Sequence, residues 1–355
     1  MTRKFMSLAM AGMMGASLLA GCGSSGTSSA ATETTEDTAA VSSSVKTLPD
    51  DDTVAVSSTS KAEAKYNMGY VLSVRDEYLS LLEEAVADQA EANDVDMDMY
   101  FAENDSSRVL QYIEQAKNEG KDAILVNVVA AEDAAACVEA AGDTPLVFIN
   151  RAPADSGVLT DTAVAVVSDE NESGKMQGEF LADYFNEQGQ SDVSYLLLEG
   201  TEGLVHTTLR TDGAIAAMKD GGLNVTEAGI VMGDYDRTAA ADGVASLLEE
   251  GVDFDVILSN NDAMALGAIQ AMKDAGVDPT SKVIVGIDGL GDAQAALESG
   301  EMKMTVYQDA VGQADASIKA AINMVEGKDA ADGIEYPTAD GDAHTIYVPF
   351  VEITK

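Results

Sequence analysis

The stretch FDVILSNNDAMALGAIQAMKDAG, residues 254–276, decides the fold class. It opens with a short apolar run that suits a buried strand, and it continues with the apolar spacing of a helix that ends at Gly276. The chain repeats this unit of strand and helix from Tyr66 onward. Short apolar strands between helices that end in glycine predict a parallel sheet with helices on both faces.

The repeated pattern forms two similar units, and the second begins near residue 168. In the first unit, the pattern predicts strands over residues 66–74, 95–102, 122–129, 145–150 and 163–168. In the second unit, it predicts strands over residues 192–200, 223–231, 254–260 and 282–289. A strand over 303–309, a helix over 313–328 and a final strand over 345–353 follow. The fold class expected from this pattern is α/β, with two doubly wound units.

Acidic residues dominate the charge of the chain. The sequence has 62 Asp and Glu residues against 20 Lys and Arg residues, which gives a formal net charge of −42. A protein with this charge repels phosphate backbones, so we do not expect a nucleic-acid partner.

The N-terminus has the pattern of an export signal. A basic start precedes an apolar run over residues 5–20, which is too short to span a bilayer and leads into polar sequence. We expect a signal peptide over residues 1–21. Residues 19–22, Leu-Ala-Gly-Cys, resemble a bacterial lipobox, which implies cleavage before Cys22 and lipidation of its thiol. An ordinary signal peptide with an incidental cysteine is the alternative.

Residues 22–65 are expected to form a disordered tether after the lipidated cysteine. This segment is rich in Ser, Thr, Ala and Asp, and it has too few large apolar side chains to offset the entropy of ordering. A tether of this kind keeps a globular body close to the outer face of the cell membrane. The second cysteine, Cys137, lies in a stretch with helical character and is expected to be a small buried apolar residue.

Polar side chains follow the predicted strands at their carboxyl ends, where doubly wound folds bind ligands. They are Asp76, Tyr78, Asn150, Arg151, Tyr235, Asp236, Arg237, Asn260, Asn261, Asp262, Asp288, Gln308 and Asp309, together with residues 199–210. This set mixes hydrogen-bond donors and acceptors, as a ring of hydroxyl groups requires. A tyrosine can also cover the C–H face of a sugar ring.

Several of these residues have a plainer structural explanation. Asp262 could cap the helix that follows it, which would leave Asn261 beside it without a capping role. Asp288 could cap a helix that begins near Asp292. Tyr78 and Tyr235 could be ordinary core or surface aromatic residues.

His206 and Arg210 lie four residues apart, on one face of a predicted helix. The planar guanidinium of Arg210 suits two parallel bonds to neighbouring hydroxyl groups. His206 either faces the ligand or lines the rim of the site, and the sequence leaves both possibilities open.

Four segments together resemble a known family. They are LVFINRAP (146–153), SNNDAMALGAIQAMKDAG (259–276), VIVGIDG (283–289) and residues 304–333. These segments are similar to the sugar-binding type I periplasmic-binding proteins, and most to the branch that binds galactose and glucose. The similarity runs from about Asn67 to the end of the chain.

The resemblance implies two Rossmann-like lobes with a sugar between them, joined by hinge crossovers near residues 168, 308 and 344. The N-terminal lobe would comprise 66–168 and 309–344, and the C-terminal lobe 169–308 and 345–355. The residues that would bond sugar hydroxyls are Asp76, Asn150, Arg210, Asn261, Asp288 and Gln308. Tyr78 and Tyr235 would lie on the two faces of the sugar ring.

The chain departs from the galactose and glucose branch at identifiable positions. It has His206 where the branch has an acidic residue, Leu204 where the branch has a histidine, and Gln308 where the branch has an asparagine. The calcium-binding loop of the branch has no counterpart in NEQGQSDVS, residues 186–194, which is short and poor in oxygen ligands. No metal and no cofactor are therefore expected.

The sequence thus predicts a monomeric lipoprotein that captures a monosaccharide, foremost a hexose such as galactose or glucose, for the permease subunits of an ABC transporter. A sugar-sensing receptor module for a chemoreceptor or a histidine kinase is the alternative. An enzyme, with His206 as general base oriented by Asp262 or Asp288, is disfavoured. The chain has no nucleophile elbow, metal pair or phosphate-binding loop to accompany such a base.

Overall fold

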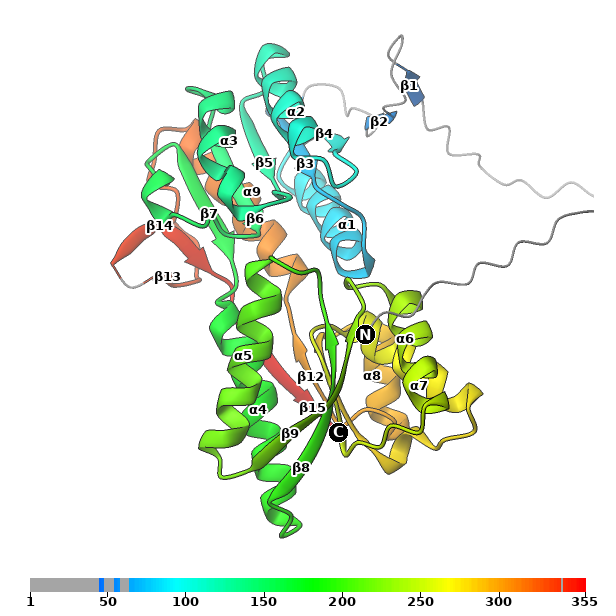
Figure 1. Ribbon diagram of the computed structural model, residues 1–355. Coiled ribbons are helices and arrows are strands. Elements are labelled where there is room, and N and C mark those ends of the chain that lie inside the picture. Colours follow the sequence, from blue (N-terminus) through cyan, green and yellow to red (C-terminus); the bar gives the residue numbers. More distant parts are fainter. Residues whose placement is uncertain (1–44, 48–53, 58–63, 340) are drawn as a thin grey trace, which may run out of the picture. The chain divides into compact units, whose positions relative to one another are not determined.

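The computed structural model describes residues 45–47, 54–57, 64–339 and 341–355 (Figure 1). The expected signal peptide over residues 1–21 and the expected lipidation site at Cys22 lie outside these residues. No helix within the described part of the chain is long and apolar enough to cross a membrane.

The first lobe is built on a largely parallel sheet with the strand order β1-β2-β4-β3-β5-β6-β7-β14-β13. Neighbours from β4 to β14 pair in parallel, and β2 and β13 pair antiparallel at either side of this block. The parallel strands are β3 (Tyr66–Leu72), β4 (Val95–Phe101), β5 (Ala123–Val126), β6 (Leu146–Asn150), β7 (Ala163–Val167) and β14 (Asp342–Tyr347). The short edge strand β13 covers Thr338–Ala339.

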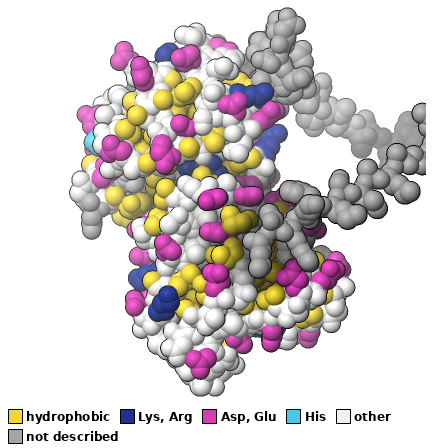
Figure 2. All heavy atoms as spheres, viewed as in Figure 1, with side chains coloured by type: hydrophobic (Ala, Val, Ile, Leu, Met, Phe, Trp, Pro, Cys, Tyr) yellow, Lys and Arg dark blue, Asp and Glu magenta, His cyan; other side chains and the backbone are white. Residues whose placement is uncertain are grey.

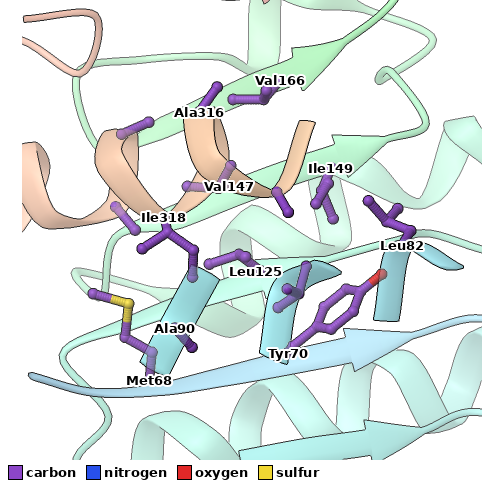
Figure 3. Packing of buried hydrophobic residues seen from close by; sticks show 14 of the residues in the cluster. Met68, Tyr70, Leu82, Ala90, Leu125, Val147, Ile149, Val166, Ala316 and Ile318 are labelled. Carbon is purple, nitrogen blue, oxygen red and sulfur yellow. The ribbon is translucent and has the colours of Figure 1, made fainter. Parts of the chain in front are cut away.

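Two layers of helices cover this sheet. Helices α1 (Glu77–Ala92) and α9 (Ala310–Val325) pack on one face, and α2 (Ser106–Asn118) and α3 (Ala134–Ala141) pack on the other. Figure 3 shows the first of these cores, in which Met68 and Tyr70 of β3 meet Leu82 of α1 and Ile318 of α9. Cys137 lies buried in the second core as a free thiol, as expected.

The second lobe repeats this arrangement on a sheet with the order β15-β12-β11-β10-β8-β9, in which only β15 runs antiparallel to its neighbour. Its strands are β8 (Asp192–Glu199), β9 (Asn224–Met232), β10 (Val256–Ser259), β11 (Val283–Asp288), β12 (Met304–Tyr307) and β15 (Val351–Thr354). One face carries α4 (Glu170–Glu187) and α5 (Val205–Asp220), and the other carries α6 (Arg237–Glu249), α7 (Asp262–Asp274) and α8 (Gly291–Ser299). The α/β fold with two doubly wound lobes, expected from the sequence, is confirmed.

The chain crosses between the two lobes three times. Two crossovers follow β7 and β12, near residues 168 and 308, the positions that the family resemblance implied. The third does not lie near residue 344, because β14 extends to Tyr347 within the first sheet. Val348 still belongs to the first core, whereas Phe350 packs in the core of the second lobe. Pro349 between them lacks an amide hydrogen, so the single strand expected over 345–353 divides here into β14 and β15.

Two short strands lie inside the segment that was expected to be an unstructured tether. Strand β1 (Val45–Thr47) pairs with β2 (Val54–Ser57), and β2 pairs antiparallel with β4. Their pairing has a simple cause, since an edge strand such as β4 presents unpaired backbone groups to any extended segment nearby. The other residues of 22–63 lie outside the described part of the chain, and a tether over them stays a prediction.

Helices α4 and α5 approach each other unusually closely, because α4 carries glycines on the face that meets α5. A Cβ atom on Gly174 would lie 2.2 Å from the carbonyl oxygen of Arg210, and one on Gly178 would lie 2.3 Å from that of Ala214. Gly178 lies one helical turn after Gly174, and Ala214 lies one turn after Arg210. The two contacts therefore follow the same order along both helices, which run parallel. This packing brings the first turn of α4 beside the first turns of α5.

We predict that Gly178→Ala destabilises the protein by about 1–3 kcal/mol, because the new methyl group must push α4 and α5 apart. Urea unfolding measures this loss. The control is Gly291→Ala, since a Cβ at Gly291 meets nothing within 4 Å; its effect should stay within about 0.5 kcal/mol. Equal stability of the two variants would contradict the close approach of the helices.

Candidate functional site

A small cavity of about 40 Å³ lies between the two lobes, at the carboxyl ends of their parallel strands. All nine residues expected to contact a ligand line it: Asp76, Tyr78, Asn150, His206, Arg210, Tyr235, Asn261, Asp288 and Gln308. Leu79, Arg151 and Leu204 complete the lining. The structure thus brings the predicted set together, and the role of each residue in binding stays a proposal.

The first lobe contributes residues that follow β3 and β6. Asp76 caps the N-terminus of α1, where its Oδ1 accepts a hydrogen bond of 2.7 Å from the amide of Leu79. Asn150 ends β6, and its Oδ1 accepts a hydrogen bond of 3.2 Å from Nδ2 of Asn127. Burial raises the pKa of Asp76, although the hydrogen bond from Leu79 opposes this shift.

Three of the lining residues have positive φ angles: 69° for Asn150, 63° for Tyr235 and 123° for Asp288. Non-glycine residues in such conformations cost about 1–3 kcal/mol each, and they gather at functional sites. Each of the three follows or ends a strand. The strained backbone therefore turns three side chains toward the space between the lobes.

The capping roles of Asn261 and Asp262 are the reverse of those inferred from the sequence. Asn261 is the N-cap of α7, and its Oδ1 accepts from the amide of Met264 at 3.0 Å. Asp262 is the first residue of the helix and lies fully buried, where it accepts from Thr305 Oγ1 at 2.7 Å and from the amide of Leu290 at 2.9 Å. The carboxylate of Asp262 therefore binds the segments beside the cavity instead of capping its own helix.

Asp288 is not a helix cap, because α8 begins after Leu290 and has no side-chain cap. The residue is 5% exposed. Its Oδ1 lies 4.0 Å from Nη1 of Arg210, which is beyond hydrogen-bond distance. Burial raises the pKa of Asp288 well above its usual range, and the nearby carboxylates of Asp262 and Asp76 add to the shift, while Arg210 opposes it. Asp288 is thus a buried acceptor aimed into the cavity.

Arg210 is held by a buried glutamate that the sequence analysis did not identify. Glu170, the first residue of α4, accepts from Nε of Arg210 at 2.8 Å and from Nη2 at 3.0 Å. Nη1 donates to the carbonyl of Asn260 at 2.8 Å. Burial alone would raise the pKa of Glu170, but the charge of Arg210, its hydrogen bonds and smaller contributions from neighbouring groups together hold the pKa below its ordinary value.

The two-pronged face of Arg210 therefore binds Glu170, and not two ligand hydroxyls as the sequence suggested. The remaining contacts of its guanidinium point to Gln308 and Asp288. Nη2 lies 3.4 Å from Oε1 of Gln308, and Nη1 lies 4.0 Å from Asp288. Arg210 still lines the cavity, but it does so as a clamped group with a fixed orientation.

His206 lies beside the same glutamate, with Nε2 at 3.4 Å from Oε1 of Glu170. Its side chain lines the cavity together with Asn150 of the other lobe. Burial lowers the pKa of His206 to about 4, even though the charge of Glu170 opposes this shift. The imidazole is therefore neutral near pH 7, and it belongs to the lining of the cavity rather than to its rim.

Two buried donors in the cavity wall have no hydrogen-bond partner among the described residues. They are the hydroxyl of Tyr78 and Nε2 of Gln308. Tyr235 differs, because its hydroxyl bonds Thr207 Oγ1 at 2.9 Å. Unsatisfied buried donors are rare in folded proteins, and in a cavity wall they indicate a site for a ligand acceptor.

Arg151 is the second residue that the predicted set omitted. It stands beside Asn150 in the sequence and was noted there as a polar residue at a strand end, so a signal for it existed. Its Nη1 donates to the carbonyl of Val128 at 2.8 Å and to Ser73 Oγ at 3.3 Å. Burial lowers the pKa of Arg151, which Asp76 opposes.

For Glu170 no local signal was available, since an acidic residue in the first turn of a helix is common. Only the packing of α4 on α5 shows its role. Within the part of the chain that the structure describes, no group of His, Cys, Asp and Glu could hold a metal ion. That no calcium or cofactor is needed stays a prediction.

Comparisons with known proteins agree with this geometry. The model of the family described as "Periplasmic binding protein domain" matches residues 68–329. The chain is 32% identical to a protein of Rhizobium meliloti assigned to rhizopine binding, over 79% of this chain and 87% of that protein. It is 28% identical to the D-galactose/methyl-galactoside binding periplasmic protein of Haemophilus influenzae, over 79% of this chain and 86% of that one.

A similar solved structure is an ABC transporter solute binding protein of Bacillus halodurans with bound myo-inositol. It aligns with a TM-score of 0.70 at 26% identity, and the alignment covers 83% of this chain and 96% of that one. The relatives are solute-binding proteins and not enzymes, in agreement with the expectation for this chain.

We predict that Glu170→Ala lowers the free energy of unfolding by about 3–5 kcal/mol, because it leaves the charge of Arg210 buried without its partner. Chemical denaturation measures the loss. The matched control is Glu172→Ala in the same helical turn, since Glu172 is half exposed and lies 3.8 Å from Lys175; its effect should be below about 1 kcal/mol. Similar losses in both variants would contradict a structural role for the Glu170–Arg210 pair.

We predict that His206 makes the stability of the protein fall as the pH is lowered. The unfolded chain binds a proton at His206 near pH 6.5, whereas the folded protein resists protonation until about pH 4. The contribution of neutral His206 is therefore complete above pH 6.5 and is lost towards pH 4, by about 2 kcal/mol between pH 7.5 and pH 5.

The measurement compares unfolding free energies of the wild-type protein and His206→Asn across this pH range. The carboxyl groups titrate in both proteins, so the difference between the two curves isolates His206. Parallel curves would show that the imidazole is not held neutral by burial.

Proposed function

This chain belongs to the periplasmic binding protein domain family, and from this premise we propose that it serves as the sugar-binding component of an ABC importer. The observation that carries this proposal is the cavity between the lobes, in which the acceptor Asp288 lies near two donors without partners, the Tyr78 hydroxyl and Gln308 Nε2. Each ring hydroxyl donates one hydrogen bond and accepts others, so a polyhydroxylated ring can satisfy both kinds of group.

The proposed ligand contacts divide between the lobes. Asp76, Tyr78 and Asn150 come from the first lobe, and His206, Arg210, Tyr235, Asn261 and Asp288 come from the second. Gln308 lies on the second crossover and is 2% exposed. A ligand in this cavity therefore bonds both lobes at once and stabilises their closed arrangement.

An ion pair across the mouth of the cleft supports a mechanism of closure. Arg237 of the second lobe makes two hydrogen bonds to the carboxylate of Glu77 of the first lobe, at 2.8 and 2.7 Å. Asp292 holds the same guanidinium from its own lobe at 3.2 Å. Opening at the three crossovers must break the bonds to Glu77, and a ligand then reaches the cavity past Asp76 and Tyr235, which line both the mouth and the cavity.

The identity of the ring is the finer part of the proposal. A hexose such as galactose or glucose follows from the likeness of the site to the hexose-binding branch and from the Haemophilus relative. A ribose import binding protein of Bacillus subtilis, 27% identical over 79% of this chain, and the inositol-bound structure make a pentose and a cyclic polyol the competitors. His206, Leu204 and Gln308 are the positions at which this choice would be made.

The cellular setting is proposed from the sequence. Lipidation at Cys22 would attach a monomer to the extracytoplasmic face of the cell membrane, and residues 22–65 would link it to the lobes. Acidic side chains outnumber basic ones on the face shown in Figure 2, in keeping with the net charge. The closed lobes would then present the bound sugar to the permease subunits.

The test is a thermal-shift panel of D-galactose, D-glucose, D-ribose and myo-inositol. At one hundred times its Kd, a ligand that binds the folded protein adds about 2.7 kcal/mol of stability, which raises Tm by several degrees. We expect at least one ring to do so. Absence of a shift with every ring would overturn the proposed function.

The same panel is repeated with Asp288→Asn, which replaces one carboxyl oxygen by an amide nitrogen and keeps the size of the side chain. We expect the Kd of the ring that binds to rise by about tenfold or more, because the variant leaves a bound hydroxyl without its buried acceptor, which costs about 1–3 kcal/mol. Asp183→Asn on the exposed face of α4 is the control, and its effect on Kd should be small. Equal affinity of Asp288→Asn and wild type would remove Asp288 from the site.

A further inference from the structure

A second cavity, of about 240 Å³, adjoins the one that the proposed function uses. Asn150, Arg151, Leu204 and His206 line both cavities, so the two are neighbouring parts of one cleft. The second cavity continues past these residues between the loops that follow β5 and β6, the first crossover and the start of α5. No ligand contact proposed above uses this space.

The lining of the second cavity is largely apolar. The apolar side chains include Val129, Ala131, Ala152, Pro153, Val205 and Leu209. They come from both lobes, as do the walls of the first cavity. In the first cavity, by contrast, nine of the twelve lining residues are those expected to hold a ligand through polar or aromatic contacts.

Three of the polar groups that line the second cavity have partners within the protein. Ser168 Oγ accepts from Nε2 of Gln313 at 3.0 Å. Asp169 caps α4 and accepts from the backbone and the side chain of Asn171 at 3.1 and 2.8 Å. Glu170 is bound by Arg210. Part of their hydrogen-bonding capacity is thus already used, and the larger share of the surface that the cavity offers is apolar.

The two cavities together therefore describe a ligand with two chemically different parts. We infer that the second cavity is a subsite for an apolar alkyl or aryl substituent, carried on an oxygen of the ring that the first cavity holds. This inference rests on the proposed function and adds to it the class of ligand: an ether or glycoside of a sugar or cyclic polyol. Leu204 and His206 lie at the junction, where the substituent leaves the ring.

Burial in this subsite predicts a graded gain in affinity. Each methylene group moved from water into an apolar site contributes about a fourfold gain in binding. A butyl substituent should therefore bind at least tenfold more tightly than a methyl substituent on the same ring. A second sugar ring should gain less than butyl, because most of the surface that it would meet is apolar.

Calorimetry on the mature full-length protein tests this with three matched series. They are galactose, ribose and myo-inositol, each compared with its methyl and n-butyl derivatives, in both anomers for the two sugars. A disaccharide of galactose is added as the polar extension. We expect the butyl derivative to bind most tightly in the series whose free ring binds.

Ala131→Leu extends a side chain into the second cavity and should abolish the gain from butyl, while the affinity for the free ring stays within about twofold. Ala152→Leu extends a side chain into the same cavity from the loop that follows β6, and it replaces the first variant in the test if that variant fails to fold. Ala87→Leu, on the exposed face of α1, is the matched control and should keep the full gain.

The outcomes separate the two proposals. Binding of a free ring with no gain from butyl overturns the subsite and leaves the proposed function intact. A tighter fit of the disaccharide also overturns it, because the extension would then be polar. If no ring binds in any series, the proposed function fails, and the subsite fails with it.

Discussion

The site depends on one buried interaction, the ion pair between Glu170 and Arg210. Removing two charges from water costs several kcal/mol each, so a pair of this kind is not retained for stability alone. What it provides is orientation: two bonds to Glu170 and one to the carbonyl of Asn260 leave the guanidinium a single arrangement. Glycines on α4 make the pair possible, because they let α5 approach closely enough for the first turns to meet.

Much of the site could be predicted from the sequence, because parallel strands deliver their carboxyl ends to one edge of a sheet. Asp76, Asn150, Asp288 and Gln308 were each found as polar residues after an apolar run, and the fold places them around one cavity. Glu170 escaped because its role depends on contacts between two helices. The sequence of α4 alone describes an ordinary acidic first turn, and only the register of α4 against α5 makes that residue part of the site.

Single-residue assignments were harder than the topology. Asn261 and Asp262 are both good capping residues, and local propensity does not say which one caps α7. The structure decides through burial: Asp262 binds Thr305 and the amide of Leu290, so it holds the segment that follows Asp288. The family resemblance placed the third crossover too early, near residue 344. The apolar run over 345–353 reads as one strand, and the break at Pro349 is visible only when each half is assigned to a different core.

The two basic side chains on α5 that line the cavity present no unpaired positive charge to it. Arg210 is neutralised by Glu170, and His206 with a pKa of about 4 carries no charge near pH 7. The groups left for a ligand are acceptors such as Asp288 and donors such as Gln308 Nε2 and the hydroxyl of Tyr78. Each unsatisfied buried group already carries a cost of about 1–3 kcal/mol in the folded protein. A hydroxyl that bonds one of them recovers that cost, and because the groups are fixed beforehand, little further ordering opposes binding.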